Sequence, residues 1–315
     1  MLDKFGRKIE YLRLSVTERC TLRCAYCRVD DGYCPKAAEL SADEFTRIVR
    51  VCADLGIKKV RLTGGEPLLR KDIIDIVRNI AQIEGIHELS MTTNAQQLGG
   101  KAFELKQAGL DRINISLDSL DAIKFKEMTG GDLSLVLTGI DDAIAVGLLP
   151  VKVNAVLVRG KNDNEVDDFI ALTQERPIDV RFIELMPLGD LGQDETLRIY
   201  NDDLIKARPY LKPMPPRYSS QPSRDFQVEG YLGRVGFISP LSHKFCGLCN
   251  RIRLMSDGML RMCLGVDSEV SMLDALNLDD DALREAIKNA IYNKPAQHEF
   301  EGYFVSDKNM RRIGG

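Results

Sequence analysis

The sequence predicts an α/β fold, an incomplete (βα)6 TIM-like barrel followed by a smaller C-terminal region. Six short strand-like runs alternate with amphipathic helical stretches over the first half of the chain. Strand–helix units in series form parallel sheets with right-handed crossovers. Within the runs, apolar residues alternate with polar ones, unlike the continuous apolar strands of a sheet that is buried on both faces. The 315-residue chain is long enough to bury a substantial core.

The expected elements follow one another in order. We expect strands at Tyr11–Val16, Lys59–Thr63, Glu88–Thr93, Arg112–Leu117, Val151–Val156 and Asp179–Ile183. We expect helices between them at Ala42–Leu55, Lys71–Ile83, Lys101–Ala108, Leu133–Val146 and Asn164–Glu175. Ser41 and Glu44 form a capping-box signature before the first of these helices.

One face of the predicted sheet carries polar and cationic side chains. Arg13, Arg61 and Lys152 alternate with apolar neighbours, and successive strand residues face opposite sides. A complete eight-stranded barrel fills its interior with branched apolar side chains. A cationic interior therefore favours an incomplete, wider barrel that holds a large polar ligand. The alternative is a sheet whose polar face is exposed to solvent.

The C-terminal part is expected to differ from the barrel. Residues 1–208 form the predicted barrel, residues 209–225 a Pro- and Ser-rich crossing, and residues 226–315 the smaller region. Asp257-Gly258 predicts a hairpin between Arg251–Met255 and Met259–Met262. A last helix is expected at Asp281–Tyr292.

Composition limits the classes of partner. The net charge is −4, so no basic field would attract nucleic acid, although a local Arg and Lys cluster could still bind an anionic small molecule. The sequence has no apolar run of the roughly 18–20 residues that span a bilayer, and its start does not resemble a signal peptide. We therefore expect a cytoplasmic protein with no membrane partner.

Six of the eight cysteines form two spaced triplets. These are Cys20-x3-Cys24-x2-Cys27 and Cys246-x2-Cys249-x13-Cys263. Thiolates suit zinc or iron–sulfur clusters. A [4Fe–4S] cluster normally takes four cysteines, so three would leave one iron open. The alternatives are zinc sites completed by Cys34 and by His243 respectively, while Cys52 is expected to be a buried core thiol.

The N-terminal triplet, with Tyr26 before its last cysteine, resembles the signature loop of the radical S-adenosylmethionine (SAM) superfamily. The resemblance implies that the open iron binds SAM, and that one electron from the cluster cleaves SAM to methionine and a 5′-deoxyadenosyl radical. Thr63-Gly64-Gly65-Glu66-Pro67 is similar to the superfamily motif for the SAM amino group. Two glycines let the backbone approach a ligand, and Glu66 can accept from an ammonium group.

Both triplets together with Gly314-Gly315 resemble one family, molybdenum-cofactor biosynthesis protein A, the GTP 3′,8-cyclases. The match runs over nearly the whole chain, although Arg28-Val29 replaces the usual Met-Pro and the segment from Glu184 to Cys246 is short. The resemblance implies conversion of GTP to (8S)-3′,8-cyclo-7,8-dihydroguanosine 5′-triphosphate, the first step of molybdenum cofactor biosynthesis.

The resemblance also implies site residues. Two [4Fe–4S] clusters would be bound by Cys20, Cys24 and Cys27 and by Cys246, Cys249 and Cys263, with the guanine on the open iron of the second cluster. SAM would contact Tyr26, Gly65, Ser116 and Met186. GTP would contact Arg13, Arg61, Thr92, Lys152, Arg251, Ile252 and Arg253. The Gly-Gly tail would enter the active site, with Arg311 and Arg312 meeting phosphate or carboxylate at its mouth.

Further partners follow from the same resemblance. They are an electron donor such as flavodoxin or ferredoxin and, for the product, cyclic pyranopterin monophosphate synthase, with the chain as a monomer or homodimer. Two other functions stay open on the sequence: a radical SAM peptide-modifying enzyme with an auxiliary cluster, and a non-catalytic metal-binding protein.

Overall fold

The computed structural model describes residues 1–27, 39–300 and 310–314, and it confirms the predicted series of six parallel strands. These are β1 (Tyr11–Ser15), β2 (Lys59–Thr63), β3 (Glu88–Thr93), β4 (Arg112–Ser116), β5 (Val151–Leu157) and β6 (Ile178–Glu184). Each pairs with the next in parallel register. Cys34 and Arg28-Val29 lie outside the described residues.

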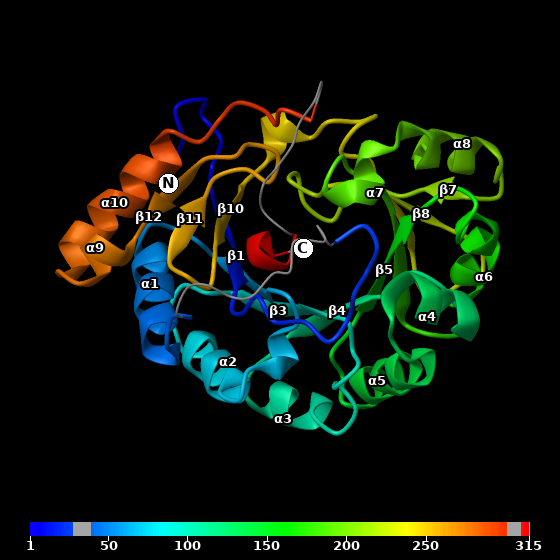
Figure 1. Ribbon diagram of the computed structural model, residues 1–315, viewed down its shortest axis with the longest axis horizontal. Coiled ribbons are helices and arrows are strands. Elements are labelled where there is room, and N and C mark those ends of the chain that lie inside the picture. Colours follow the sequence, from blue (N-terminus) through cyan, green and yellow to red (C-terminus); the bar gives the residue numbers. More distant parts are fainter. Residues whose placement is uncertain (28–38, 301–309, 315) are drawn as a thin grey trace.

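The expected helices lie on the outside of the curved sheet (Figure 1). They are α1 (Ala42–Asp54), α2 (Ile73–Ala81), α3 (Ala102–Gln107), α5 (Leu133–Ala145) and α6 (Val166–Ala171). Ser41 caps α1, because its hydroxyl accepts from the Glu44 amide at 3.3 Å while the Glu44 carboxylate accepts from the Ser41 amide at 2.7 Å. One more helix on this side, α4 (Ala122–Thr129), was not expected.

The C-terminal half adds strands to both edges of the same sheet. The strands are β7 (Lys212–Pro213), β8 (Ser223–Gln227), β9 (Val235–Ile238), β10 (Arg251–Leu254), β11 (Met259–Arg261) and β12 (Glu269–Ser271). The order of the sheet is β12-β11-β10-β1-β2-β3-β4-β5-β6-β9-β8-β7. Because β10 pairs in parallel with β1 and β9 with β6, the C-terminal half extends the parallel wall at both edges.

Further helices complete the described chain. They are α7 (Gly189–Gln193), α8 (Asn201–Lys206), α9 (Leu273–Leu276), α10 (Asp280–Tyr292) and α11 (Met310–Ile313), with 3-10 turns at Pro67–Leu69, Asp163–Glu165, Glu195–Leu197 and Cys246–Leu248. The predicted hairpin and last helix are confirmed as β10–β11 and α10. Within the described residues, no helix is both long and apolar enough to span a membrane.

The alternating pattern of the strands separates two environments. Leu12, Leu14, Val60 and Leu62 belong to the main hydrophobic cluster together with apolar residues of the outer helices. Burying one such side chain stabilises the fold by about 1.5–3 kcal/mol. The polar residues between them face the interior of the sheet, as the sequence predicts. In Figure 1 this interior contains α11, near the C-terminus.

Candidate active site

A cavity of about 330 Å³ occupies the interior of the curved sheet. Both cysteine triplets contribute to its lining, so the fold brings together two motifs that are far apart in the sequence. Most of the other predicted ligand contacts also line it: Tyr26, Gly65, Ser116, Met186, Arg13, Arg61, Thr92, Arg251 and Arg253. Two predicted contacts do not line this cavity, Lys152 and Ile252.

The first triplet lies in the loop that follows β1. The Cys27 amide donates to the Cys24 carbonyl at 3.0 Å, and the Leu22 amide donates to Cys20 Sγ at 3.4 Å. Burial raises the pKa of all three thiols, that of Cys27 to about 12. For Cys24 and Cys27 the charges of neighbouring thiolates act in the same direction. A metal centre that binds here would therefore displace protons from the cysteines.

The Gly-Gly-Glu motif at the end of β2 packs against this loop. A Cβ atom on Gly65 would lie 2.3 Å from the Arg19 carbonyl oxygen, and one on Gly64 would lie 2.4 Å from that of Thr17. The Gly65 amide donates to the Thr17 carbonyl at 2.7 Å. The glycines are thus required by a close approach to the backbone just before Cys20. Both also line the cavity, so the predicted approach of Gly65 to a ligand stays a prediction.

Glu66 joins the ends of β2 and β3. Its buried carboxylate accepts from the Thr93 hydroxyl at 2.6 Å, the Asn94 amide at 2.7 Å and the Leu68 amide at 3.1 Å. Glu66 is not among the residues that line the cavity. That it accepts from a ligand ammonium group stays a prediction.

Tyr26 is held by a buried carboxylate. Its hydroxyl donates to Asp118 Oδ2 at 2.7 Å, and the Val156 amide donates to Asp118 Oδ1 at 2.9 Å. Burial raises the pKa of Asp118 to about 6, although both hydrogen bonds oppose this shift. The aromatic residue of the first triplet is therefore fixed to the ends of β4 and β5, beside Ser116.

A cluster of buried cations lies on the strands. Burial, together with Arg112, Arg13 and Arg181, lowers the pKa of Arg61 to about 9. Burial and the neighbouring cations Arg181, Arg112 and Arg61 lower the pKa of Lys152 to about 5. Lys152 is thus buried within the cationic cluster although it does not line the cavity.

Several polar atoms of the lining lack a partner among the described residues. They include Asn114 Nδ2 and Asn154 Oδ1, which are fully buried. Buried polar atoms are normally hydrogen-bonded, so an orphaned pair beside a cationic cluster indicates a site for a polar, anionic molecule.

Ile252, a predicted GTP contact, does not present its side chain to the cavity, because that side chain belongs to the hydrophobic core on the other face of β10. Only its backbone is available to a ligand in the cavity.

Cations lie near the second cysteine triplet and affect the pKa of its thiols. Burial raises the pKa of Cys249, but Lys294, Arg251 and Arg7 outweigh burial and the pKa is lowered from its usual value. Burial raises the pKa of Cys263, against the opposing effect of Lys294.

The zinc alternative that used His243 is wrong for this structure, because His243 Nε2 lies 2.8 Å from Asp202 Oδ2 on the exposed side of the chain. No three Cys, His, Asp or Glu side chains converge on a single ion in residues 1–27, 39–300 and 310–314.

The C-terminal tail enters the cavity. Gly314 adopts a left-handed φ of +77°, its carbonyl accepts from the Arg253 guanidinium, and a Cβ atom there would lie 2.4 Å from Thr63 Oγ1. Met310 and Arg311 line the cavity. Arg312 pairs instead with protein carboxylates, at 2.7 Å from Asp257, 3.2 Å from Glu269 and 3.3 Å from Glu18. Arg312 therefore anchors the tail, and Gly315 lies outside the described residues.

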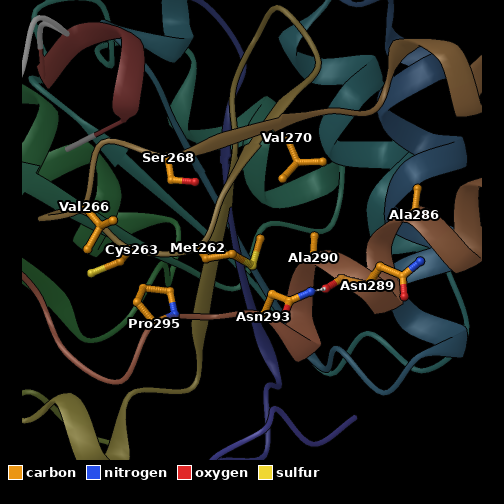
Figure 2. Close-up of a pocket in the computed structure, with 10 residues that line it drawn as sticks. All are labelled: Met262, Cys263, Val266, Ser268, Val270, Ala286, Asn289, Ala290, Asn293 and Pro295. Atoms are coloured by element: carbon orange, nitrogen blue, oxygen red, sulfur yellow. Dashed lines mark hydrogen bonds between the residues drawn. The ribbon is translucent and has the colours of Figure 1, made fainter.

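A second pocket, of about 400 Å³, lies on the other side of Cys263 (Figure 2). Its walls come from β11–β12 and α10, and they carry mostly apolar side chains. The lining residues are Met262, Cys263, Val266, Ser268, Val270, Ala286, Asn289, Ala290, Asn293 and Pro295. Met262 and Cys263 line both this pocket and the central cavity, so a thin wall separates the two.

Two cations of the cavity lining, Arg181 and Lys294, were not predicted as ligand contacts. Arg181 lies on β6 between Val180 and Phe182, so the alternation that identified Arg13 and Arg61 also applies to it. Lys294 follows α10 directly and is 2% exposed. No pattern in the sequence marks it, because a single Lys after a helix is usually a solvated residue.

The chain matches two family models and is similar to curated proteins over most of its length. Residues 14–173 match the family model of the Radical SAM superfamily, and residues 178–300 match that of Molybdenum Cofactor Synthesis C. The GTP 3′,8-cyclase of Alkaliphilus oremlandii is 46% identical over 321 residues, which cover 100% of both chains. That of Listeria monocytogenes serovar 1/2a is 45% identical and covers 94% of this chain and 91% of its own.

A solved structure is similar in fold. The crystal structure of Streptococcus suis SuiB aligns with a TM-score of 0.62 at 17% sequence identity, covering 90% of this chain and 67% of that one. At this identity the similarity concerns the fold alone.

Proposed function

This chain belongs to the GTP 3′,8-cyclase family of the radical SAM superfamily, and we propose that the residues around its central cavity bind SAM, GTP and two iron–sulfur clusters. It is a radical SAM enzyme of molybdenum cofactor biosynthesis. The observation that carries the proposal is the shared lining: six cysteines, the proposed SAM contacts and most of the proposed GTP contacts surround one volume.

We assign Cys20, Cys24 and Cys27 to the first [4Fe–4S] cluster. Three soft thiolates at the edge of a buried cavity suit such a cluster and leave one iron for SAM. When bound, the cluster and SAM supply the 5′-deoxyadenosyl radical with which the family reaction begins. The chain's own part is to orient SAM through Tyr26, Gly65, Ser116 and Met186 and to exclude water from the site.

We assign the cationic cluster to the triphosphate of GTP. Arg13 and Arg61 offer bidentate donors, Lys152 a point charge, and Arg181 extends the set. We assign Cys246, Cys249 and Cys263 to a second [4Fe–4S] cluster that holds the guanine, with Arg251 and Arg253 beside it. Fixing both ends of GTP sets the distance between the ribose and SAM, and positioning of this kind accounts for much of the rate in intramolecular reactions.

The remaining assignments concern partners. We propose cytoplasmic action, an electron donor such as flavodoxin or ferredoxin, and transfer of the product to cyclic pyranopterin monophosphate synthase. Identity of 46% over the full length to a GTP 3′,8-cyclase favours the cyclase over a peptide-modifying enzyme. The direct test is anaerobic incubation of the reconstituted enzyme with GTP, SAM and dithionite. Formation of the cyclised nucleotide is expected, and SAM cleavage without it would contradict the assignment.

Replacing Arg61 with Ala is expected to weaken GTP binding by about 1.5–3 kcal/mol, roughly tenfold to 150-fold, because a charged hydrogen-bonding partner of the phosphates is lost. SAM cleavage by dithionite should persist. Anaerobic equilibrium dialysis measures the affinity. Arg78→Ala is a matched control, since Arg78 is half-exposed on α2 and pairs with Asp75 at 2.6 Å. Unchanged GTP affinity in Arg61→Ala would refute the assignment.

GTP binding is expected to take up about one proton near pH 7 through Lys152. With a pKa of about 5, Lys152 is neutral in the free protein at this pH, and a nearby triphosphate favours its charged form. This contribution to affinity therefore decreases as pH rises above 5. Calorimetry in buffers of different ionisation enthalpy measures the uptake. Lys152→Met should lack it, and the titration of GTP itself, common to both proteins, cancels in the comparison.

A further inference from the structure

Lys294 occupies an unusual position beside the second cysteine triplet. Its side chain lines the central cavity, as Cys246, Cys249 and Cys263 do, while its neighbours Asn293 and Pro295 line the outer pocket shown in Figure 2. The side chain therefore points inward from the thin wall between the two spaces. It is 2% exposed, although a lysine is almost never buried unless it is paired.

The surroundings hold this lysine in place. Its ammonium group donates to the Met262 carbonyl, one residue before Cys263. Arg7 fixes the segment that follows, because its guanidinium donates to the carbonyls of Cys246, Pro295 and Ala296 at 2.6–3.0 Å. Asp3 in turn pairs with Arg7 at 2.6 Å. The chain around Lys294 is thus tied to two of the three cysteines of the triplet.

Lys294 is a buried cation beside the cysteines. It lines the same cavity as Cys249 and Cys263, and its ammonium group bonds to the carbonyl of the residue before Cys263. An ammonium group has three N–H donors. The Met262 carbonyl takes one of them, so two more can point toward cluster sulfur atoms in the same cavity.

We propose that Lys294 is a positioning and charge-compensating residue that raises the reduction potential of the second iron–sulfur cluster. The inference rests on the proposed second cluster. A cluster held by three thiolates is anionic, and reduction by one electron adds a further negative charge. Net charge and hydrogen bonds to the sulfurs set the potentials of such clusters. A buried cation therefore stabilises the reduced form more than the oxidised form, because a fixed positive charge is weakly screened there.

The test isolates the second cluster in the full-length chain. Cys20, Cys24 and Cys27 are replaced together by Ala, so that only the C-terminal triplet can hold iron. The midpoint potential is then measured by an anaerobic, dithionite-mediated titration followed by electron paramagnetic resonance. Three changes at lysines are compared in this background: Lys294→Met, which keeps the length and removes the charge; Lys294→Arg, which keeps the charge; and Lys288→Met. Lys288 is the matched control, because it is a solvent-accessible lysine of α10 paired with Glu285 at 2.7 Å.

We expect Lys294→Met to shift the redox equilibrium at least tenfold toward the oxidised form, which for one electron is a potential about 59 mV lower. Lys294→Arg and Lys288→Met should stay within about threefold of the parent. The resonance signal comes only from loaded protein, so the comparison holds even if Lys294→Met binds less iron. An unchanged potential in Lys294→Met, or an equal fall in Lys294→Arg, would overturn the proposal. Absence of iron from the parent with Lys294 intact would instead refute the second cluster itself.

Discussion

Deletion of Gly314 and Gly315 is expected to abolish formation of the cyclised nucleotide while the fold and both clusters remain. Gly314 lies against the wall of the cavity, because its carbonyl accepts from Arg253, and an added Cβ atom would meet the side chains of Thr63 and Ser15. Arg253 would lose this partner and be free to move from its place beside the second triplet. Displacement of a positioning group by about 1 Å can cost roughly a hundredfold in rate, so we expect at least that loss.

The measurement is product formation by the truncated enzyme, with its iron content and SAM binding determined in parallel. Gly314→Ala is a milder variant, because an added Cβ would lie 2.4 Å from Thr63 Oγ1 on a backbone with φ of +77°. It should lower turnover as well. Parent-like turnover by the truncated enzyme would show that the tail is only a packed terminus.

Replacing Cys20, Cys24 and Cys27 together with Ala is expected to eliminate SAM cleavage completely. The three thiols are the proposed ligands of the cluster that reduces SAM. The iron content after anaerobic reconstitution should fall from about eight to about four atoms per chain. Methionine and 5′-deoxyadenosine are measured by chromatography after reduction with dithionite.

Cys52→Ala is the control for this triple replacement. Cys52 is fully buried in α1 against the main hydrophobic cluster, so its loss removes a thiol without touching either triplet. The Cys52→Ala enzyme should keep about eight irons and its SAM cleavage. If the triple variant still cleaves SAM, or if stoichiometric zinc replaces iron in the anaerobically produced parent, the radical assignment fails.

The barrel and its polar interior could be predicted from the sequence because they depend on local alternation. Strands β2 and β3 begin and end at the predicted residues, and Arg13 and Arg61 face the cavity as their alternation with Leu12, Leu14 and Val60 requires. The alternation does not predict close contacts between backbone segments. Gly65 meets the carbonyl oxygen of Arg19, and no periodicity indicates that approach.

The contributions of the C-terminal half could not be predicted because they depend on contacts between distant segments. Nothing near Arg251 indicates that β10 joins β1, and nothing near Lys294 indicates that it lies beside two cysteines. Glu66 shows a related limit. The same sequence motif is compatible with a carboxylate that binds a ligand and with one that joins two strands. The contacts of Glu66 with Thr93 and Asn94 are visible only in the structure.

The pairing of β1 with β10 has a consequence for the synthesis of the protein. Tyr11 pairs with Arg251, so one edge of β1 stays without its partner until about 240 more residues have been made. At 5–20 residues per second this takes roughly 12–48 s on the ribosome. An open strand edge is a template for aggregation, and here it adjoins the loop of the first cysteine triplet. We expect the yield of folded protein to depend on translation rate and chaperone supply, because one edge of β1 is paired only late in translation.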